Sequence, residues 1–214
     1  IALCYAVGCT TARVTPMPPK PAPTPTEERV IYSSGHYPTN MTSLNLRGHG
    51  LISLPREAVE VTQLRDLYLD GNAGLALGAD LRKFQNLRHL TVDRCGLSEF
   101  PGDICSLATL ETLSLENNRL TGVPAGIGNL KHLVALNVSS NKLTALPAEI
   151  GELESLILFS PAHNLLSELP AAIGRLTNLR ALVLEGNRLT ALPEEICNLP
   201  RLENLNLRGN KLAK

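Results

Sequence analysis

The sequence contains no Trp, and aromatic residues make up only 3% of its 214 residues. It carries no net charge, because 20 Lys and Arg balance 20 Asp and Glu, so no overall positive field steers it toward nucleic acid. No apolar run reaches the roughly 18 residues of a membrane-spanning helix. Apolar residues still make up 43% of the chain, so its core must consist mostly of Leu, Ile, Val and Ala.

Motifs that carry catalysis are also missing. The sequence has no Gly-rich loop of the kind that cradles phosphate, no cluster of metal ligands and no nucleophile motif. Its five His are scattered, and the paired carboxylates of Glu194 and Glu195 are typical of a solvated face. We therefore expect no enzymatic activity, no cofactor and no bound metal.

What the sequence contains in quantity is a repeat of 23 residues, which predicts a solenoid. Position 1 of each copy is held by Met41, Leu64, Leu87, Leu110, Leu133, Leu156, Leu179 and Leu202. Position 9 is held by His49, Asn72, Cys95, Asn118, Asn141, Asn164, Asn187 and Asn210. Seven complete copies occupy 41–201, and a partial eighth reaches Lys214.

Each column of the repeat has a structural reason. Apolar residues at positions 4 and 6, such as Leu113 and Leu115, alternate as on the inner face of a strand, and stacking the copies makes a parallel sheet. The Asn at position 9 can satisfy loop backbone groups of its own and the next repeat, so losing it should cost about 1–3 kcal/mol. The following Pro, such as Pro124, ends the extended structure and starts the return along the convex side.

The resulting pattern, LxxLxLxxNxLxxLPxxIGxL, resembles the leucine-rich repeats of the 23-residue type over about four-fifths of the chain. The resemblance implies an α/β repeat solenoid: a right-handed horseshoe with a parallel concave β-sheet and short helical or irregular convex segments. This domain would span 41–214, with the C-terminal cap missing. Residues 30–40 would form a rudimentary N-terminal cap in which Val30 and Ile31 cover the open end.

Several copies depart from the pattern. His49 and Cys95 replace Asn in its column, and Gly74 and Gly78 replace the Leu and Pro of the second copy, which predicts a reshaped loop there. Pro161 replaces an inward Leu, so its strand should be bent or weakly paired on one side. Drift in one repeat is the preferred interpretation of Pro161, and a functional notch is the alternative.

The five Cys give no disulfide framework. Cys4 and Cys9 lie at the N-terminus, whereas Cys95, Cys105 and Cys197 lie inside repeats. Cys105 and Cys197 share a column four repeats apart, which is roughly 19 Å at the spacing of stacked strands and too far for a disulfide. We interpret the three Cys within the repeats as buried thiols that do not report the redox compartment.

The N-terminal segment predicts a membrane anchor. Residues 1–9 are apolar and are interpreted as a partial signal peptide, and Ala6–Cys9 resembles the lipobox of bacterial lipoproteins, in which the Cys is diacylated. Residues 10–29 contain six Pro and predict an extended, disordered tether. We therefore expect localisation at the bacterial cell envelope through a lipid at Cys9. For residues 1–9 the alternatives are a secretory h-region or a chance apolar terminus. For the Pro-rich segment the alternative is an SH3-type ligand, and for the localisation it is a secreted or cytoplasmic chain.

Positions 3, 5 and 7 of each copy should project from the concave sheet. They predict an acidic strip, Asp66, Asp70, Asp93 and Glu116, and a small apolar patch, Leu158, Ala162, Ala181 and Val183. Arg65, Arg88 and Arg94 are close enough in the repeat to neutralise much of the strip. The residues that we predict to bind a partner are Asp66, Tyr68, Asp70, His89, Asp93, Glu116, Leu158, Val183 and Glu185.

The expected function is that of a non-enzymatic module that presents a curved surface to a protein or peptide. We expect a monomer that binds no nucleic acid and touches a membrane only through Cys9. Replacing Tyr68, Asp93 and Glu116 should weaken binding without unfolding. The alternatives are the sensor or substrate-recognition part of a larger receptor or enzyme, and a structural surface protein or adhesin.

Overall fold

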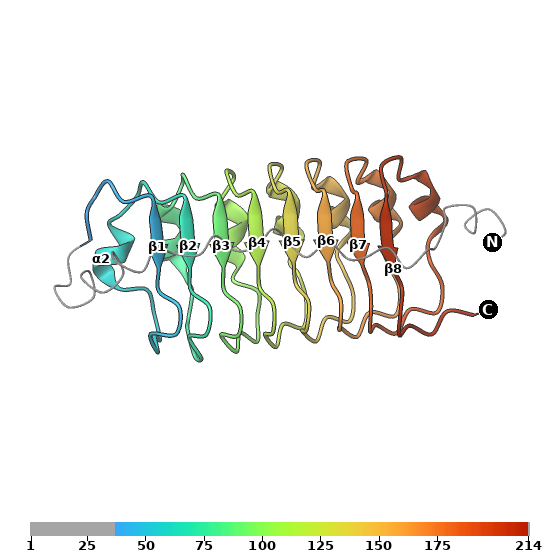
Figure 1. The fold of residues 1–214 in the computed structure, drawn as a ribbon, viewed down its shortest axis with the longest axis horizontal. Helices are drawn as coiled ribbons and strands as arrows, with labels where there is room; N and C mark the ends of the chain where they lie inside the picture. The colour runs from blue at the N-terminus through green and yellow to red at the C-terminus, as the bar shows by residue number, and fades with distance from the viewer. Residues whose placement is uncertain (1–36, 214) are drawn as a thin grey trace.

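The computed structural model describes residues 37–213, and its strands form one parallel sheet (Figure 1). The sheet has eight strands in chain order, and each residue pairs with the one 23 positions later, as Leu113 does with Leu136. The strands are β1 Ser43–Asn45, β2 Asp66–Tyr68, β3 His89–Thr91, β4 Thr112–Ser114, β5 Ala135–Asn137, β6 Leu158–Ser160, β7 Ala181–Val183 and β8 Asn204–Asn206. The predicted α/β repeat solenoid is confirmed.

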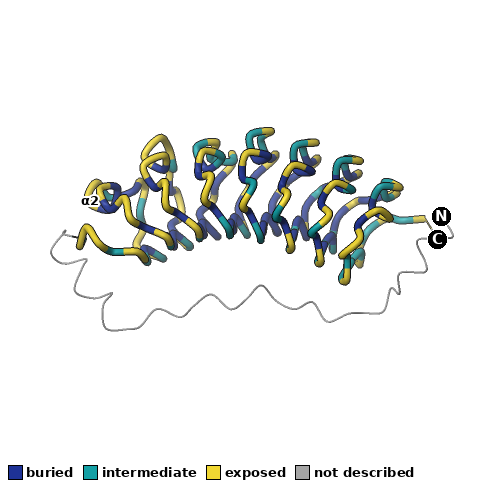
Figure 2. Tube along the Cα trace, turned by 90° about the horizontal axis from the view of Figure 1, so that it is seen from above, coloured by how far each residue is buried: buried dark blue, intermediate teal, exposed yellow. Residues whose placement is uncertain are grey.

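Short helical turns form the opposite, convex side. They are α2 Arg56–Val59, η2 Ala79–Lys83, η3 Gly102–Ser106, η4 Ala125–Asn129, η5 Ala148–Glu152, η6 Ala171–Arg175 and η7 Glu194–Asn198. From η3 onward each 3-10 turn follows a Pro in extended conformation, such as Pro124 at φ −72° and ψ 153°. Pro fixes φ and has no amide hydrogen to leave unpaired, so it suits the start of a turn. Figure 2 shows the repeats fanned along an arc with the buried residues inside each coil.

The core is a stack of identical layers. Position 1, 4 and 6 side chains such as Leu110, Leu113 and Leu115 are fully buried, as are the convex residues Ile127 and Leu130. Each repeat therefore packs only on its two neighbours, and the hydrophobic stabilisation accumulates repeat by repeat.

The Asn column forms a ladder of buried hydrogen bonds. Asn141 donates from Nδ2 to the carbonyl oxygens of Leu115 and Val138, at 2.9 and 3.0 Å, and its Oδ1 accepts the amide hydrogen of Leu120 at 3.0 Å. Leu115 and Leu120 belong to the preceding repeat. The sequence prediction was right about the role of Asn but wrong about the direction, because each side chain reaches backward and not to the next repeat.

Two departures from the repeat pattern compensate for each other. Cys95 has no amide oxygen, so the loop of the second repeat loses the acceptor that Asn supplies elsewhere. Gly74, at φ +93°, instead donates its amide hydrogen to the backbone oxygen of Cys95 at 3.0 Å. The Cys95 thiol donates to the carbonyl oxygen of Leu69 at 3.2 Å, in place of an Asn side chain. The predicted reshaping of this loop is confirmed, and the substitution of Asn by Cys explains it.

Pro161 shortens the pairing of β6 with β7. The register between these strands includes two residue pairs, Leu158 with Ala181 and Phe159 with Leu182, whereas the other strand pairs include three. Pro161 has no amide hydrogen to give to the following strand. The predicted weak pairing on one side is confirmed.

The close stacking of the convex turns explains why Gly occupies the repeat position of Cys105 and Cys197 in the copies between them. A Cβ built on Gly151 would lie 2.3 Å from the carbonyl oxygen of Ala172 in the next turn, so only Gly allows the turns to stack this closely. Cys105 is half-buried and sits 3.2 Å from the position that a Cβ on Gly126 would take.

The prediction of three buried thiols was wrong for Cys197. Cys95 is buried and free, Cys105 is half-buried and free, and Cys197 is exposed and disulfide-bonded. Cys197 lies in η7, which no further convex turn covers within residues 37–213, and this accounts for its exposure.

The ends of the stack are less buried than its centre. Tyr37 and Met41 are partly buried against the core at the N-terminal end, and Leu205, Leu207 and Leu212 are partly buried at the other end. The predicted cap residues Val30 and Ile31, the lipobox and the Pro-rich tether lie outside the described residues.

We expect Asn141→Ala to lower the free energy of unfolding by about 1–3 kcal/mol, because it leaves buried backbone groups of two repeats unpaired. Urea denaturation followed by circular dichroism measures the change. The matched control is Asn129→Ala, at an exposed position on the convex side, which should alter the midpoint little. Equal midpoints for the two variants would contradict the role of the ladder.

The Cys105 thiol should react slowly with iodoacetamide at neutral pH. Burial, followed by the charge of Asp103, raises its pKa from 9.0 to about 11, so the folded chain holds the thiol protonated. The stability that this provides is present below about pH 9 and is lost as the pH rises toward 11. Alkylation followed by peptide mass spectrometry should therefore accelerate about tenfold per pH unit between about pH 8 and 10 in the native chain. In urea the rate should level off near pH 9, and a native profile that also levels off there would contradict the shift.

Candidate functional site

The concave face of the sheet displays one row of side chains from each strand. Positions 3, 5 and 7 point away from the core, and the register aligns equivalent positions of neighbouring repeats about 5 Å apart. The nine predicted binding residues all lie on this face, which the register brings together as one surface. They differ strongly in how much of each side chain reaches solvent.

Two acidic residues of the face serve the sheet itself. Asp70 accepts the amide hydrogen of Asp93 at 2.9 Å, and Asp93 in turn accepts the amide hydrogen of Glu116 at 2.9 Å and the Ser114 hydroxyl at 2.6 Å. Each carboxylate thus satisfies a backbone group of the following repeat, and Asp93 is only 7% exposed. The predicted acidic strip exists, but half of it is structural.

Tyr68 is also covered. The guanidinium of Arg47 lies 4.2 Å above its ring and makes an ion pair with Asp70, with Nε 2.6 Å from Oδ2. This leaves Tyr68 only 7% exposed. Arg47 was missed among the predicted binding residues, although its place at position 7 of the first repeat was a signal that could have found it.

The strip is neutralised in part by a residue other than the predicted Arg65, Arg88 and Arg94. Arg88 makes its ion pair with Glu111, at 2.9 Å, rather than with the strip. Arg47 instead neutralises Asp70. Arg94 is exposed and lies beside Asp93 and Glu116, where it helps to line a hollow.

That hollow encloses about 370 Å³ and is lined by Arg47, Asp70, Asp93, Arg94 and Glu116. Glu116 is half-buried and accepts a hydrogen bond from Asn137 at 3.0 Å. Next to the hollow, His89 Nε2 lies 3.8 Å from Asp66 Oδ1, and both side chains are partly exposed. The groups that face solvent in this half of the sheet are therefore Asp66, His89, Arg94 and Glu116.

The other half of the face is less polar. Leu158, Ala181 and Val183 are half-buried, whereas Ala162 is only 6% exposed, so the predicted apolar patch is small. Glu185 accepts a hydrogen bond from Asn206 at 2.9 Å. Ile157, which the sequence prediction omitted, is 39% exposed and precedes Leu158.

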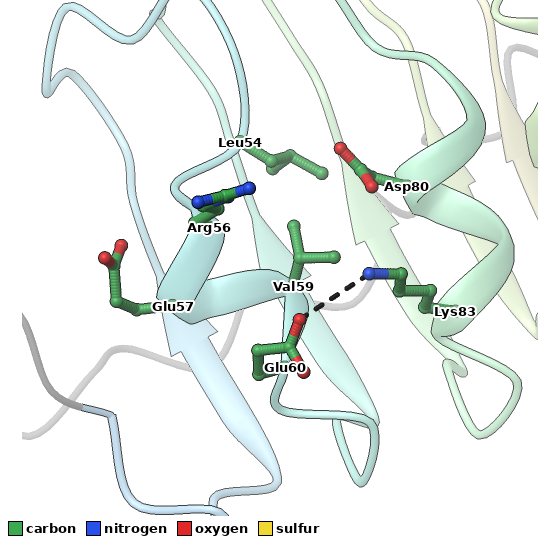
Figure 3. Close-up of a pocket in the computed structure, with 7 residues that line it drawn as sticks. All are labelled: Leu54, Arg56, Glu57, Val59, Glu60, Asp80 and Lys83. Carbon is green, nitrogen blue, oxygen red and sulfur yellow. Dashed lines mark ion pairs between the residues drawn. The ribbon is translucent and has the colours of Figure 1, made fainter.

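A second hollow of about 660 Å³ lies on the convex side between α2 and η2 (Figure 3). Val59 and Leu54 contribute apolar groups to its lining, and Lys83 pairs with Glu60 at 3.6 Å. Its remaining lining is charged, as expected of a solvated face.

Two side-chain atoms of the described region are buried without a hydrogen bond, Arg47 Nη2 and Thr91 Oγ1. Within residues 37–213 there is no group of three or more His, Cys, Asp or Glu that could hold a metal ion. The helical turns of the same region are too short and too polar to cross a membrane. The concave face therefore offers contacts for recognition, through charge at one end and apolar groups at the other.

Two sequence families match the chain. Residues 76–164 match the family described as leucine-rich repeat region, and residues 153–212 match leucine rich repeat. A comparison with curated protein sequences gives no match.

Solved structures agree with this assignment. A leucine-rich-repeat protein of Leptospira interrogans superposes with a TM-score of 0.63 at 29% identity, over 84% of this chain and 57% of that one. The ectodomain of the Arabidopsis thaliana receptor kinase GASSHO1/SCHENGEN3, in complex with CASPARIAN STRIP INTEGRITY FACTOR 2, gives 0.63 at 27% identity over 79% and 24%. The plant peptide hormone receptor RGFR1 in complex with RGF2 gives 0.61 at 28% identity over 74% and 30%.

The chain thus spans 57% of the Leptospira protein and less than a third of each receptor chain. What it shares with all three is the repeat, with its strand, its turn and its convex return. Such a fold is typically a scaffold for interaction between proteins. On its repeats, its sheet and its matched residues, the chain belongs to the leucine-rich repeat family.

Proposed function

We propose that the chain is a non-enzymatic binding module that holds a protein or peptide ligand against its concave face. The observation that carries this proposal is the rigid sheet, whose solvent-facing groups divide into a charged half around Glu116 and a less polar half around Leu158. Both halves are fixed by the same register, so a ligand that touches both needs no rearrangement of the receptor. Preorganisation of this kind lowers the entropic cost of binding.

The mechanism assigns different tasks to seven of the nine predicted residues. Asp66, His89, Glu116 and Leu158 expose groups that a ligand can contact. Tyr68, Asp70 and Asp93 are packed or hydrogen-bonded beneath them and hold the surface in shape. Replacing Tyr68 or Asp93 would therefore change stability as well as recognition.

Two peptide receptors among the similar structures support a second version of this function. Both are recorded with a bound partner, and both are much longer than this chain. The module would then be the recognition part of a larger receptor. The ligand-binding face is the same in both versions.

We also propose that a lipid at Cys9 tethers the module to the bacterial cell envelope. The support is the lipobox-like Ala6–Cys9 followed by the Pro-rich residues 10–29, which would space the repeats from the membrane.

The concave face is tested with Glu116→Lys/Leu158→Asp, which changes one partly exposed group in each half. This variant should lose at least about tenfold in affinity for a captured ligand, by loss of charge and apolar complementarity, while its melting temperature stays close to that of the parent. Proteins captured on the parent chain and on the variant are compared quantitatively by mass spectrometry. Glu194→Lys/Ala171→Asp, at exposed convex positions, is the matched control. Capture that is unchanged in the concave variant, or equally reduced in the control, would place the ligand elsewhere.

The tether is tested by expressing the gene in its native cells and comparing it with a Cys9→Ser form. The parent chain should enter the membrane fraction with an acylated Cys9 at its mature N-terminus, and the variant should leave that fraction. Intact mass spectrometry of both fractions gives the result. A soluble parent chain that retains Ile1 would contradict the anchor without affecting the concave face.

A further inference from the structure

A row of cations lies along the loops that leave the strands. Position 10 of the repeat, directly after the Asn, is held by Arg119, Lys142, Arg188 and Lys211 in four of the last five copies. All four side chains are exposed, and the copy that interrupts the row carries Leu165. No acidic residue occupies this position in any copy.

Backbone hydrogen bonds fix the spacing of the row. In the last five copies, the amide hydrogen of the position-10 residue is donated to the carbonyl oxygen of position 11 in the preceding repeat. Examples are Lys142 to Leu120 at 2.9 Å and Arg188 to Leu166 at 2.8 Å. Leu165 makes the same bond to Leu143 at 2.9 Å, so the row continues through the gap. At about 4.8 Å per repeat, the four cations extend over roughly 19 Å.

These cations are not neutralised within residues 37–213. None of the four makes an ion pair there, whereas several cations elsewhere are bridged to an acid of a neighbouring repeat. Such bridges are Arg82–Asp103, Arg88–Glu111, Lys131–Glu152 and Arg180–Glu203. Exposed carboxylates three positions further along the loop, Glu99 and Glu168, occur only in copies whose position 10 carries no cation. A copy with a cation at position 10 therefore carries no carboxylate at position 13 of the same loop.

We infer that this edge binds an acidic polysaccharide, whose sulfate or carboxylate groups recur along a linear chain. A regular row of Lys and Arg fits a polymer with regularly placed anions, and the guanidinium of Arg can hold sulfate or carboxylate through two hydrogen bonds. The row contains no aromatic residue on which bases could stack, which disfavours single-stranded nucleic acid. The surface is separate from the concave face and does not depend on the proposed ligand there.

The test measures binding of the full chain to heparin, a sulfated polysaccharide, by surface plasmon resonance at about 50 mM salt and at higher salt. Lys142→Gln/Arg188→Gln should weaken binding roughly 25-fold, at about fivefold per cation, and should make it less sensitive to salt. Leu165→Lys fills the gap in the row and should strengthen binding about fivefold. Circular dichroism melts establish that the variants are folded.

Controls separate the row from net charge. Arg65→Gln/Arg175→Gln removes two exposed cations from other faces, and Thr177→Lys adds one on the convex side. Both should change the affinity for heparin less than twofold. Absence of heparin binding by the parent chain, or equal effects in row and control variants, would overturn the inference. Tighter binding of a poly(dT) oligonucleotide than of heparin would overturn the choice of polysaccharide as the partner.

Discussion

The buried Asn amide is the interaction on which the rest of the structure depends. Each repeat leaves its strand through a turn whose backbone groups are out of reach of water, and an Asn such as Asn118 satisfies them in its own and the preceding repeat. Without that side chain the Leu layers could still pack, but the turns between them would bury unpaired polar groups. The one interior copy without Asn, at Cys95, keeps its stack because Gly74 changes the loop below it.

The same demand for hydrogen bonds reaches the concave surface. Asp70 and Asp93 lie among the residues that a ligand would be expected to meet, yet their oxygens accept amide hydrogens of the following repeat. A surface carboxylate can therefore be part of the scaffold. Recognition is left to partly exposed groups such as Glu116 and His89, whose side chains contact the side chains of Asn137 and Asp66 rather than the backbone of the next repeat.

The fold was largely predictable because the period of the repeat fixes which residues share a layer. The columns at positions 4, 6 and 9 gave the strand, its inner face and its turn, and even the weak pairing at Pro161 followed from a missing amide hydrogen. The candidate site was less predictable. Its face and its members followed from the alternation of the strand, but the burial of Tyr68 under Arg47 depends on two side chains 21 residues apart.

The sequence by itself determined the solenoid, the register of its sheet and the side of each strand that faces solvent, because these follow from periodicity alone. Tertiary structure decided which outward residues are free. Arg47 pairs with Asp70, Arg88 pairs with Glu111, and the Asn ladder points backward along the stack. It also left Arg119 and Lys142 without an ion pair in residues 37–213. The physical reason is that the repeat period determines which residues occupy equivalent positions. Ion pairs and hydrogen bonds between different positions depend on side-chain distances that only the folded arc sets.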